Sequence, residues 1–187
     1  MKIDRNLNLV LPIELDEGTA HVHSTPIDEA VFDRYFMTIT RTYSAMLENG
    51  GSWMLTSGPQ VAARMLKRIA QQDGTWEGPQ GVELGLMAEI RRRTNILALT
   101  PQGWDMIPLQ SALDKGFVSG TDAIEVDNAV TFFTVLSAAM RRKEAESLLE
   151  AAFGLRDGQT TSSTCSEYMS FLRTSTTGAN TGAKAAR

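Results

Sequence analysis

The chain has 187 residues, of which 42% are hydrophobic, and a formal net charge of −4. This length supports one sizeable core but is cramped for two independent domains. The acidic balance disfavours a general affinity for nucleic acid, because that affinity needs a surplus of Lys and Arg to face the phosphates. Cys165 is the single cysteine, so an intrachain disulfide is excluded and few ligands remain for a zinc site.

Residues 1–24 predict a small N-terminal β-hairpin. Every second residue from Leu7 to Ile13 is apolar, which is the period of a half-buried strand. The turn residues 16–18 follow, and 19–23 can return as the partner strand. His21 and His23 would then share one strand face. We interpret that face as solvated rather than as a two-histidine metal clip, because no third ligand is close in the sequence.

Two further properties of the chain bear on where it works. Its first eight residues are charged or polar at most positions and precede no uninterrupted apolar segment, so we expect no signal peptide. No window approaches the 18 consecutive apolar residues of a membrane span. We therefore expect a protein of the cytoplasm of the cell that makes it.

Residues 25–173 predict a helical domain. Thr25-Pro26 is a favoured helix start, and apolar residues at spacings of three and four follow it as far as Leu47. The same signals predict further elements: a helix from Ser57 to Asp73, one over about 80–95, a strand or packed loop at 96–99, and a short helix at 109–115.

The segment Ser119–Phe153 carries the longest helical periodicity in the chain. Its apolar residues from Val126 to Met140 recur at spacings of three and four, which predicts one stripe that faces a core. Residues 141–143 are basic and indicate a helix end or a sharp bend. After Gly158 the composition becomes rich in Ser and Thr, and Ser163 or Thr164 can cap one last short helix.

The sequence thus predicts a mainly α fold, a helical bundle-like single domain with a small N-terminal β-hairpin and a disordered C-terminal tail. Its expected parts are the hairpin segment at 1–24, the helical domain at 25–173 and a flexible polar tail at 174–187, because the last segment has no large apolar residue.

Catalytic motifs are absent from the sequence. There is no phosphate-binding loop, HExxH or GxSxG pattern, and the glycine spacing at 78–85 does not fit a dinucleotide fingerprint. The adjacent acids are typical of helix caps. We therefore predict no enzyme, no catalytic residues, no cofactor and no metal. The basic cluster Arg91–Arg93 is predicted to be a solvated or salt-bridged helix end, because the helix dipole favours cations there.

Four stretches, in their order and spacing, resemble structural-gene products of tailed bacteriophages, in particular the tail assembly chaperones of long-tailed phages. They are the strand pair leading into VFDRYFMTITRTYSAML, AARMLKRIAQQDGTWEG with LMAEIRRRTNIL, GTDAIEVDNAVTFFTVLSAAM, and SSTCSEYMSFLRTST. The resemblance spans most of residues 5–175 and is one of layout and helix pattern. That family has no active site, so the resemblance supplies no catalytic residues.

The resemblance implies an interaction protein that coats the helical tape measure protein before the tail tube polymerises round it. Its partner would be the tape measure protein or another phage tail protein, and self-association is a further option. A structural virion component, such as a tail completion, connector or minor capsid protein, is the alternative. A third class, a nucleic-acid-binding protein that uses Arg91–Arg93, would show salt-dependent DNA binding.

Partner binding by such a protein would use apolar anchors in a groove that takes a helix. We expect the anchors among the large aromatic residues that a monomer buries least easily. Phe132 is one of them, because Phe133 beside it cannot face the same side of one helix. The candidate partner-binding residues are Tyr35, Phe36, Trp53, Trp76, Trp104 and Phe132.

Overall fold

The computed structural model describes residues 7–15 and 18–182, with side chains as far as Ser175. The elements follow in the order β1 (Asn8–Leu15), β2 (Gly18–Ser24), α1 (Glu29–Glu48), α2 (Gly51–Thr56), α3 (Gly58–Gln72), η1 (Glu83–Met87), α4 (Ala88–Arg92), β3 (Thr94–Thr100), β4 (Gly103–Pro108), α5 (Leu109–Asp114), α6 (Gly120–Ala139), α7 (Arg142–Gly154), β5 (Gln159–Thr161) and α8 (Cys165–Gly182).

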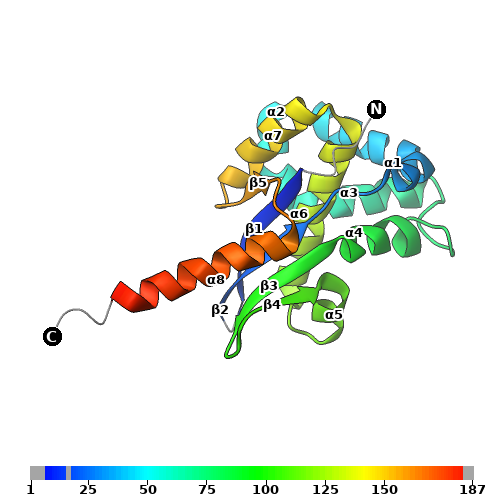
Figure 1. The fold of residues 1–187 in the computed structure, drawn as a ribbon. Coiled ribbons are helices and arrows are strands. Elements are labelled where there is room, and N and C mark those ends of the chain that lie inside the picture. Colours follow the sequence, from blue (N-terminus) through cyan, green and yellow to red (C-terminus); the bar gives the residue numbers. More distant parts are fainter. Residues whose placement is uncertain (1–6, 16–17, 183–187) are drawn as a thin grey trace.

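The strands form one antiparallel sheet in the order β4-β3-β2-β1-β5 (Figure 1). The predicted hairpin is confirmed, since β1 pairs with β2 and Leu11 lies opposite Val22. The predicted turn residues Asp16 and Glu17 lie outside the described residues. Ile96 of β3 lies opposite Val22 in turn, so the hairpin is joined to a strand about 70 residues further along the chain.

The predicted fold class, a mainly α helical bundle with only a small hairpin, is wrong. The chain has a mixed α/β fold, because β3, β4 and β5 extend the hairpin to a sheet of five strands within the described residues. Gly103 and Pro108 are the cause of the error. They are typical of breaks, but here they are the two ends of β4, and the positive φ of Gly103 suits the tight turn that leads into it.

Helix α6 is the centre of the core, behind the sheet in Figure 1. The predicted single apolar stripe is wrong, because α6 is buried on every side from Asn128 to Ala138. It packs against β1 of the sheet and against helices α1, α3, α4 and α7. A helix with neighbours all round can bury adjacent residues, so Phe132 and Phe133 are both fully buried.

The predicted break after this helix is confirmed. Met140 and Arg141 have extended backbone, and α7 begins at Arg142. The helix predicted over about 80–95 is shorter than expected, because β3 already begins at Thr94, and its first turn is the π-helix η1. Helix α1 is kinked at Tyr35, whose φ of −109° and ψ of 17° are not helical.

Helix α8 lies across the opposite face of the sheet and contacts β4 (Figure 1). The predicted cap is confirmed at Thr164: its Oγ1 accepts from the backbone N–H of Glu167 at 3.3 Å, and Glu167 Oε2 accepts from the N–H of Thr164 at 2.7 Å. The helix continues to Gly182, into the segment for which the sequence predicts a flexible tail. Residues 183–187 lie outside the described part of the chain.

Candidate functional site

A groove follows one flank of α3 where this helix crosses the first half of α6. It consists of two adjoining hollows, of about 760 and 300 Å³, which share Arg64, Ile124 and Asn128 as lining residues. Its apolar lining comes from both helices and from β1, through Pro59, Ala63, Val126, Ala129 and Leu11. We call this feature the α3–α6 groove.

The crossing of α3 and α6 is fixed at two places beside the groove. Gly58, at the start of α3, lies so close to α6 that a methyl group there would be 2.5 Å from Phe132 Cε2. Further along, Asn128 Oδ1 accepts from the backbone N–H of Ala63 at 2.9 Å, and Asn128 Nδ2 donates to the carbonyl of Ile124 at 2.8 Å. These contacts position the floor of the groove.

Ile124 lies in the middle of the groove and is 45% exposed. It lines both hollows, and a partner side chain in either of them would contact it. Covering a half-exposed isoleucine with a partner stabilises the complex by about 25 cal/mol for each Å² of apolar surface that is removed from water. Ile124 is therefore the apolar side chain of the groove that a partner would most directly cover.

Trp76 closes one end of the groove. Its loop is tied down by backbone hydrogen bonds on both sides, from Thr75 N–H to the carbonyl of Ala70 at 2.8 Å and from Glu83 N–H to the carbonyl of Trp76 at 3.1 Å. Lys67 Nζ lies 5.0 Å from the centroid of the indole ring, within the range of a cation–π contact. The indole is thus an ordered, half-buried wall of the smaller hollow.

Arg91 and Asp127 form an ion pair at the Trp76 end of the groove. Arg91 donates two hydrogen bonds to the carboxylate of Asp127, at 3.0 and 2.6 Å, and so joins α4 to α6. This two-point hydrogen bond raises the pKa of Arg91 further above its ordinary value. The pair is a fixed part of the wall.

The α3 and α6 flanks of the groove carry opposite charge, while Glu14, Glu83 and Arg156 line it from other elements. Arg64 and Lys67 stand on α3, whereas Asp122 and Glu125 stand on α6. Within the described part of the chain, no ion pair or hydrogen bond engages the side chains of Arg64, Asp122 and Glu125, and Lys67 has only its contact with the Trp76 ring. Charged groups remain available at the rim for a partner.

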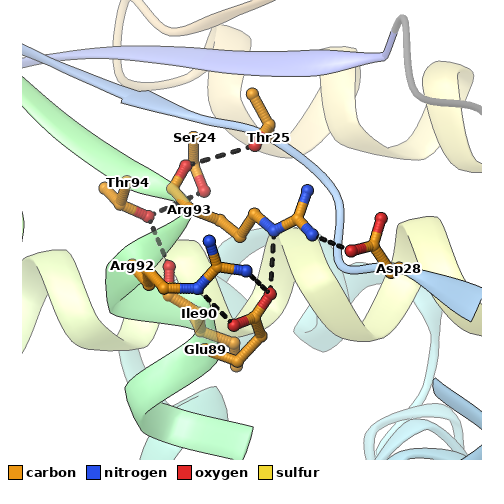
Figure 2. A network of polar contacts seen from close by, with 8 residues as sticks. All are labelled: Ser24, Thr25, Asp28, Glu89, Ile90, Arg92, Arg93 and Thr94. Atoms are coloured by element: carbon orange, nitrogen blue, oxygen red, sulfur yellow. Dashed lines mark hydrogen bonds and ion pairs between the residues drawn. The ribbon is translucent and has the colours of Figure 1, made fainter. Parts of the chain in front are cut away.

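The other arginines of the basic cluster belong to a polar network where β2 ends and β3 begins (Figure 2). Arg92 donates to Glu89 at 2.6 Å, and Arg93 donates to Glu89 at 2.8 Å and also pairs with Asp28. Burial tends to raise the pKa of Glu89, but the hydrogen bonds from both arginines outweigh it and lower that pKa. The predicted salt-bridged helix end is confirmed.

The network in Figure 2 also joins the backbone of distant segments. Thr25 N–H donates to the carbonyl of Arg93 at 3.0 Å, and the hydroxyls of Ser24 and Thr94 lie 2.9 Å apart. The end of β2, the start of β3 and α4 are thus held together. The role of these arginines is to anchor α4, which carries Arg91 at the groove.

Trp76 is the one predicted partner-binding residue that lines the α3–α6 groove. Two of the others are buried, contrary to expectation. Phe132 is packed between Gly58 and Phe153, whose ring centroid is 5.8 Å away. Tyr35 is 7% exposed because its ring turns into the core and its hydroxyl donates to the carbonyl of Gln80 at 3.1 Å. Neither side chain can anchor a partner on the surface.

The remaining predicted residues are scattered over the molecule. Phe36 on α1 is 47% exposed and packs edge to face on Phe32, with the ring centroids 5.6 Å apart. Trp53 is half-buried in α2 and packs on the core. Trp104 is half-buried in β4, with its ring 5.6 Å from that of His21.

The interpretation of the histidine face as solvated is wrong, because α8 covers it. His23 is completely buried, and its Nε2 donates to the carbonyl of Ser163 at 3.1 Å, which also accepts from Asn8 Nδ2 at 2.9 Å. The ring of Tyr168 on α8 lies over both histidines. Burial lowers the pKa of His21 and of His23, so both are neutral at pH 7.

No protein family, curated protein or solved structure matches this chain. In the part of the chain that the structure describes, no three His, Cys, Asp or Glu side chains are grouped so that they could bind a metal ion. No helix among these residues has the length and apolar character needed to cross a bilayer.

Ile124 and Arg64 are the central groove residues that the sequence analysis missed. A signal for the basic wall was present, because Gln60, Arg64 and Lys67 recur on one outward face of the helix predicted from Ser57 to Asp73. For Ile124 there was none, since the sequence does not reveal which apolar residue of a central helix its neighbours leave uncovered.

Proposed function

We propose that this protein is a tail assembly chaperone of a tailed bacteriophage, which binds and solubilises the tape measure protein during tail morphogenesis in the host cytoplasm. The α3–α6 groove is the observation that carries the proposal. Its half-exposed Ile124, ordered Trp76 wall and charged rim suit the apolar face of a helix. The likeness in layout to tail assembly chaperones supplies the biological setting.

The length and expected weak affinity of one groove suit a chaperone that covers a long helix with many copies. From Pro59 to Lys67 the α3 flank is about 12 Å long at 1.5 Å per residue, so it spans about two turns of a bound helix. A partner Leu or Phe that becomes fully buried contributes about 1.5–3 kcal/mol, so two or three anchors only match the lower part of the association cost of about 4–15 kcal/mol. Each groove therefore binds weakly by itself, and many copies of the protein along one partner cover that partner reversibly.

The test is co-expression with the longest apolar-rich, coiled open reading frame encoded next to this gene, taken as the tape measure protein. Pull-down and size-exclusion chromatography then measure how much of it stays soluble and co-elutes. Ile124→Glu is expected to abolish co-elution, because it places a carboxylate on the apolar floor. Leu99→Glu is the matched control, since Leu99 is 53% exposed on β3, away from the groove.

The outcomes separate the protein classes. Loss of co-elution with Ile124→Glu but not with Leu99→Glu supports a chaperone that uses the groove. Co-elution that both variants retain rejects the groove as the binding site. If the tape measure protein stays insoluble while this chain alone assembles into rings or tubes, the alternative holds and the protein is a structural virion component.

A further inference from the structure

We infer that the oppositely charged walls of the α3–α6 groove select an amphipathic helix with acidic residues on one flank and basic residues on the other, and that they fix the direction in which this helix lies. The inference rests on the proposed function in one respect, namely that the occupant of the groove is a helix. It adds the chemistry of that helix and its orientation.

The spacing of the wall charges matches that of a helix. Arg64 and Lys67 are three residues apart on α3, and Asp122 and Glu125 are three residues apart on α6. Each pair therefore spans about one helical turn, which is the distance between residues three or four apart on a bound helix. Acidic residues along one flank of the partner can face the α3 wall, and basic residues along its other flank can face the α6 wall.

The charge pattern determines direction because the groove has an apolar floor. A bound helix must keep its apolar stripe toward Ile124, so it has two placements, which differ by a half-turn about the axis normal to the floor. That half-turn reverses the helix and exchanges its flanks. Only one direction then brings opposite charges together on both walls, whereas the other brings like charges together on both.

The probes for this inference are labelled 18-residue model helices that share one leucine stripe. The mixed peptide has Glu on one flank and Lys on the other, the acidic peptide has Glu on both, and the basic peptide has Lys on both. Fluorescence anisotropy is expected to give the mixed peptide about ten-fold tighter binding at low salt, from several exposed pairs of modest strength. The advantage should shrink in high salt, because exposed charges are screened.

Two variants with altered wall charges are expected to change which peptide binds most tightly. R64E/K67E makes both walls acidic, so the basic peptide should become the best ligand, and D122K/E125K should make the acidic peptide the best. R34E/R68E is the charge-matched control, since both arginines are exposed and neither lines the groove. An unfolded variant could not gain affinity for a new peptide, so the exchange cannot arise from misfolding.

Direction is measured with a nitroxide at the N-terminus of the mixed peptide, which broadens the NMR signal of a nearby indole N–H. Trp76 closes one end of the groove, and its signal is assigned with Trp76→Phe. Exchanging the Glu and Lys flanks of the peptide should move the label to the other end of the groove. The broadening of the Trp76 signal should therefore differ strongly between the two peptides.

Equal affinity for all peptides, or a ranking unchanged in R64E/K67E, would overturn the inference, and so would binding of none of them. Equal broadening of Trp76 by both flank arrangements would overturn the assignment of direction. These results are independent of the co-expression experiment. A protein that solubilises the tape measure protein through Ile124 but ranks the peptides equally is a chaperone with a purely apolar groove.

Discussion

Replacing Phe132 by alanine is expected to destabilise the fold by about 3–5 kcal/mol, the usual cost of removing a fully buried Phe ring. The edge-to-face contact with Phe153 is lost with the ring and belongs to this cost. For a chain of this size, 1 kcal/mol corresponds to about 2–4 °C in melting temperature, so we expect Tm to fall by about 6–20 °C.

Gly58 makes the prediction specific to the packing of α3 on α6. A methyl group at Gly58 would lie 2.5 Å from Phe132 Cε2, so Gly58→Ala alone should cost about 1–3 kcal/mol through overpacking. In the Phe132→Ala background the ring is gone, and the new methyl group enters the space that it leaves. The cost of Gly58→Ala should then vanish or become a small gain, since alanine is the better helix former.

The assay is a double-mutant cycle in urea, followed by far-UV circular dichroism. The free energies of unfolding of the parent, both single variants and the double variant give the coupling between the two positions, which should be about 1–3 kcal/mol in favour of the double variant. Additive costs would refute the close approach of α3 and α6. A Phe132→Ala variant as stable as its parent would refute the burial of the ring.

Two further predictions concern buried polar groups elsewhere. Gly85→Ala should destabilise the chain more than Tyr35→Phe, because a methyl group at Gly85 would overlap Tyr35 Oη, whereas Tyr35→Phe removes one hydrogen bond worth about 1 kcal/mol. Urea denaturation of both variants ranks them. Stability should fall as the pH drops below about 6.5, because burial lowers the pKa of His21 and His23 in the folded chain and the unfolded chain then binds more protons. Urea titrations between pH 8 and 5.5 measure the slope, which should flatten in H21N/H23Q.

Local signals of the sequence predicted the elements whose partners are close along the chain. The hairpin β1–β2 has its period-2 pattern and its partner within 24 residues, and the start of α3 is marked by Gly58-Pro59. Strand β4 could not be found in this way. Its residues pair with β3 in a register that places Trp104 opposite Leu99, and its boundary residues are those that usually end a strand.

The candidate site was harder to predict, because exposure depends on tertiary neighbours. Phe132 and Ile124 are both large apolar residues of α6, and the sequence favoured the aromatic one as the exposed anchor. The structure gives the opposite exposure, since α3 and α7 enclose the part of α6 with Phe132, while the groove leaves Ile124 open. Periodicity identifies the helix, but not which of its sides neighbouring helices leave uncovered.

Asn128 connects the core to the groove. An asparagine with both polar ends satisfied is tolerated in a buried helix, whereas an apolar residue at this position could not accept from the N–H of Ala63. The hydrogen bond therefore holds α3 at a fixed place on α6, with Gly58 against Phe132 on one side and the hollows around Ile124 on the other. Because the same crossing sets the tight packing and the open groove, the position of the charged walls follows from the core, and a partner meets a surface that is already organised.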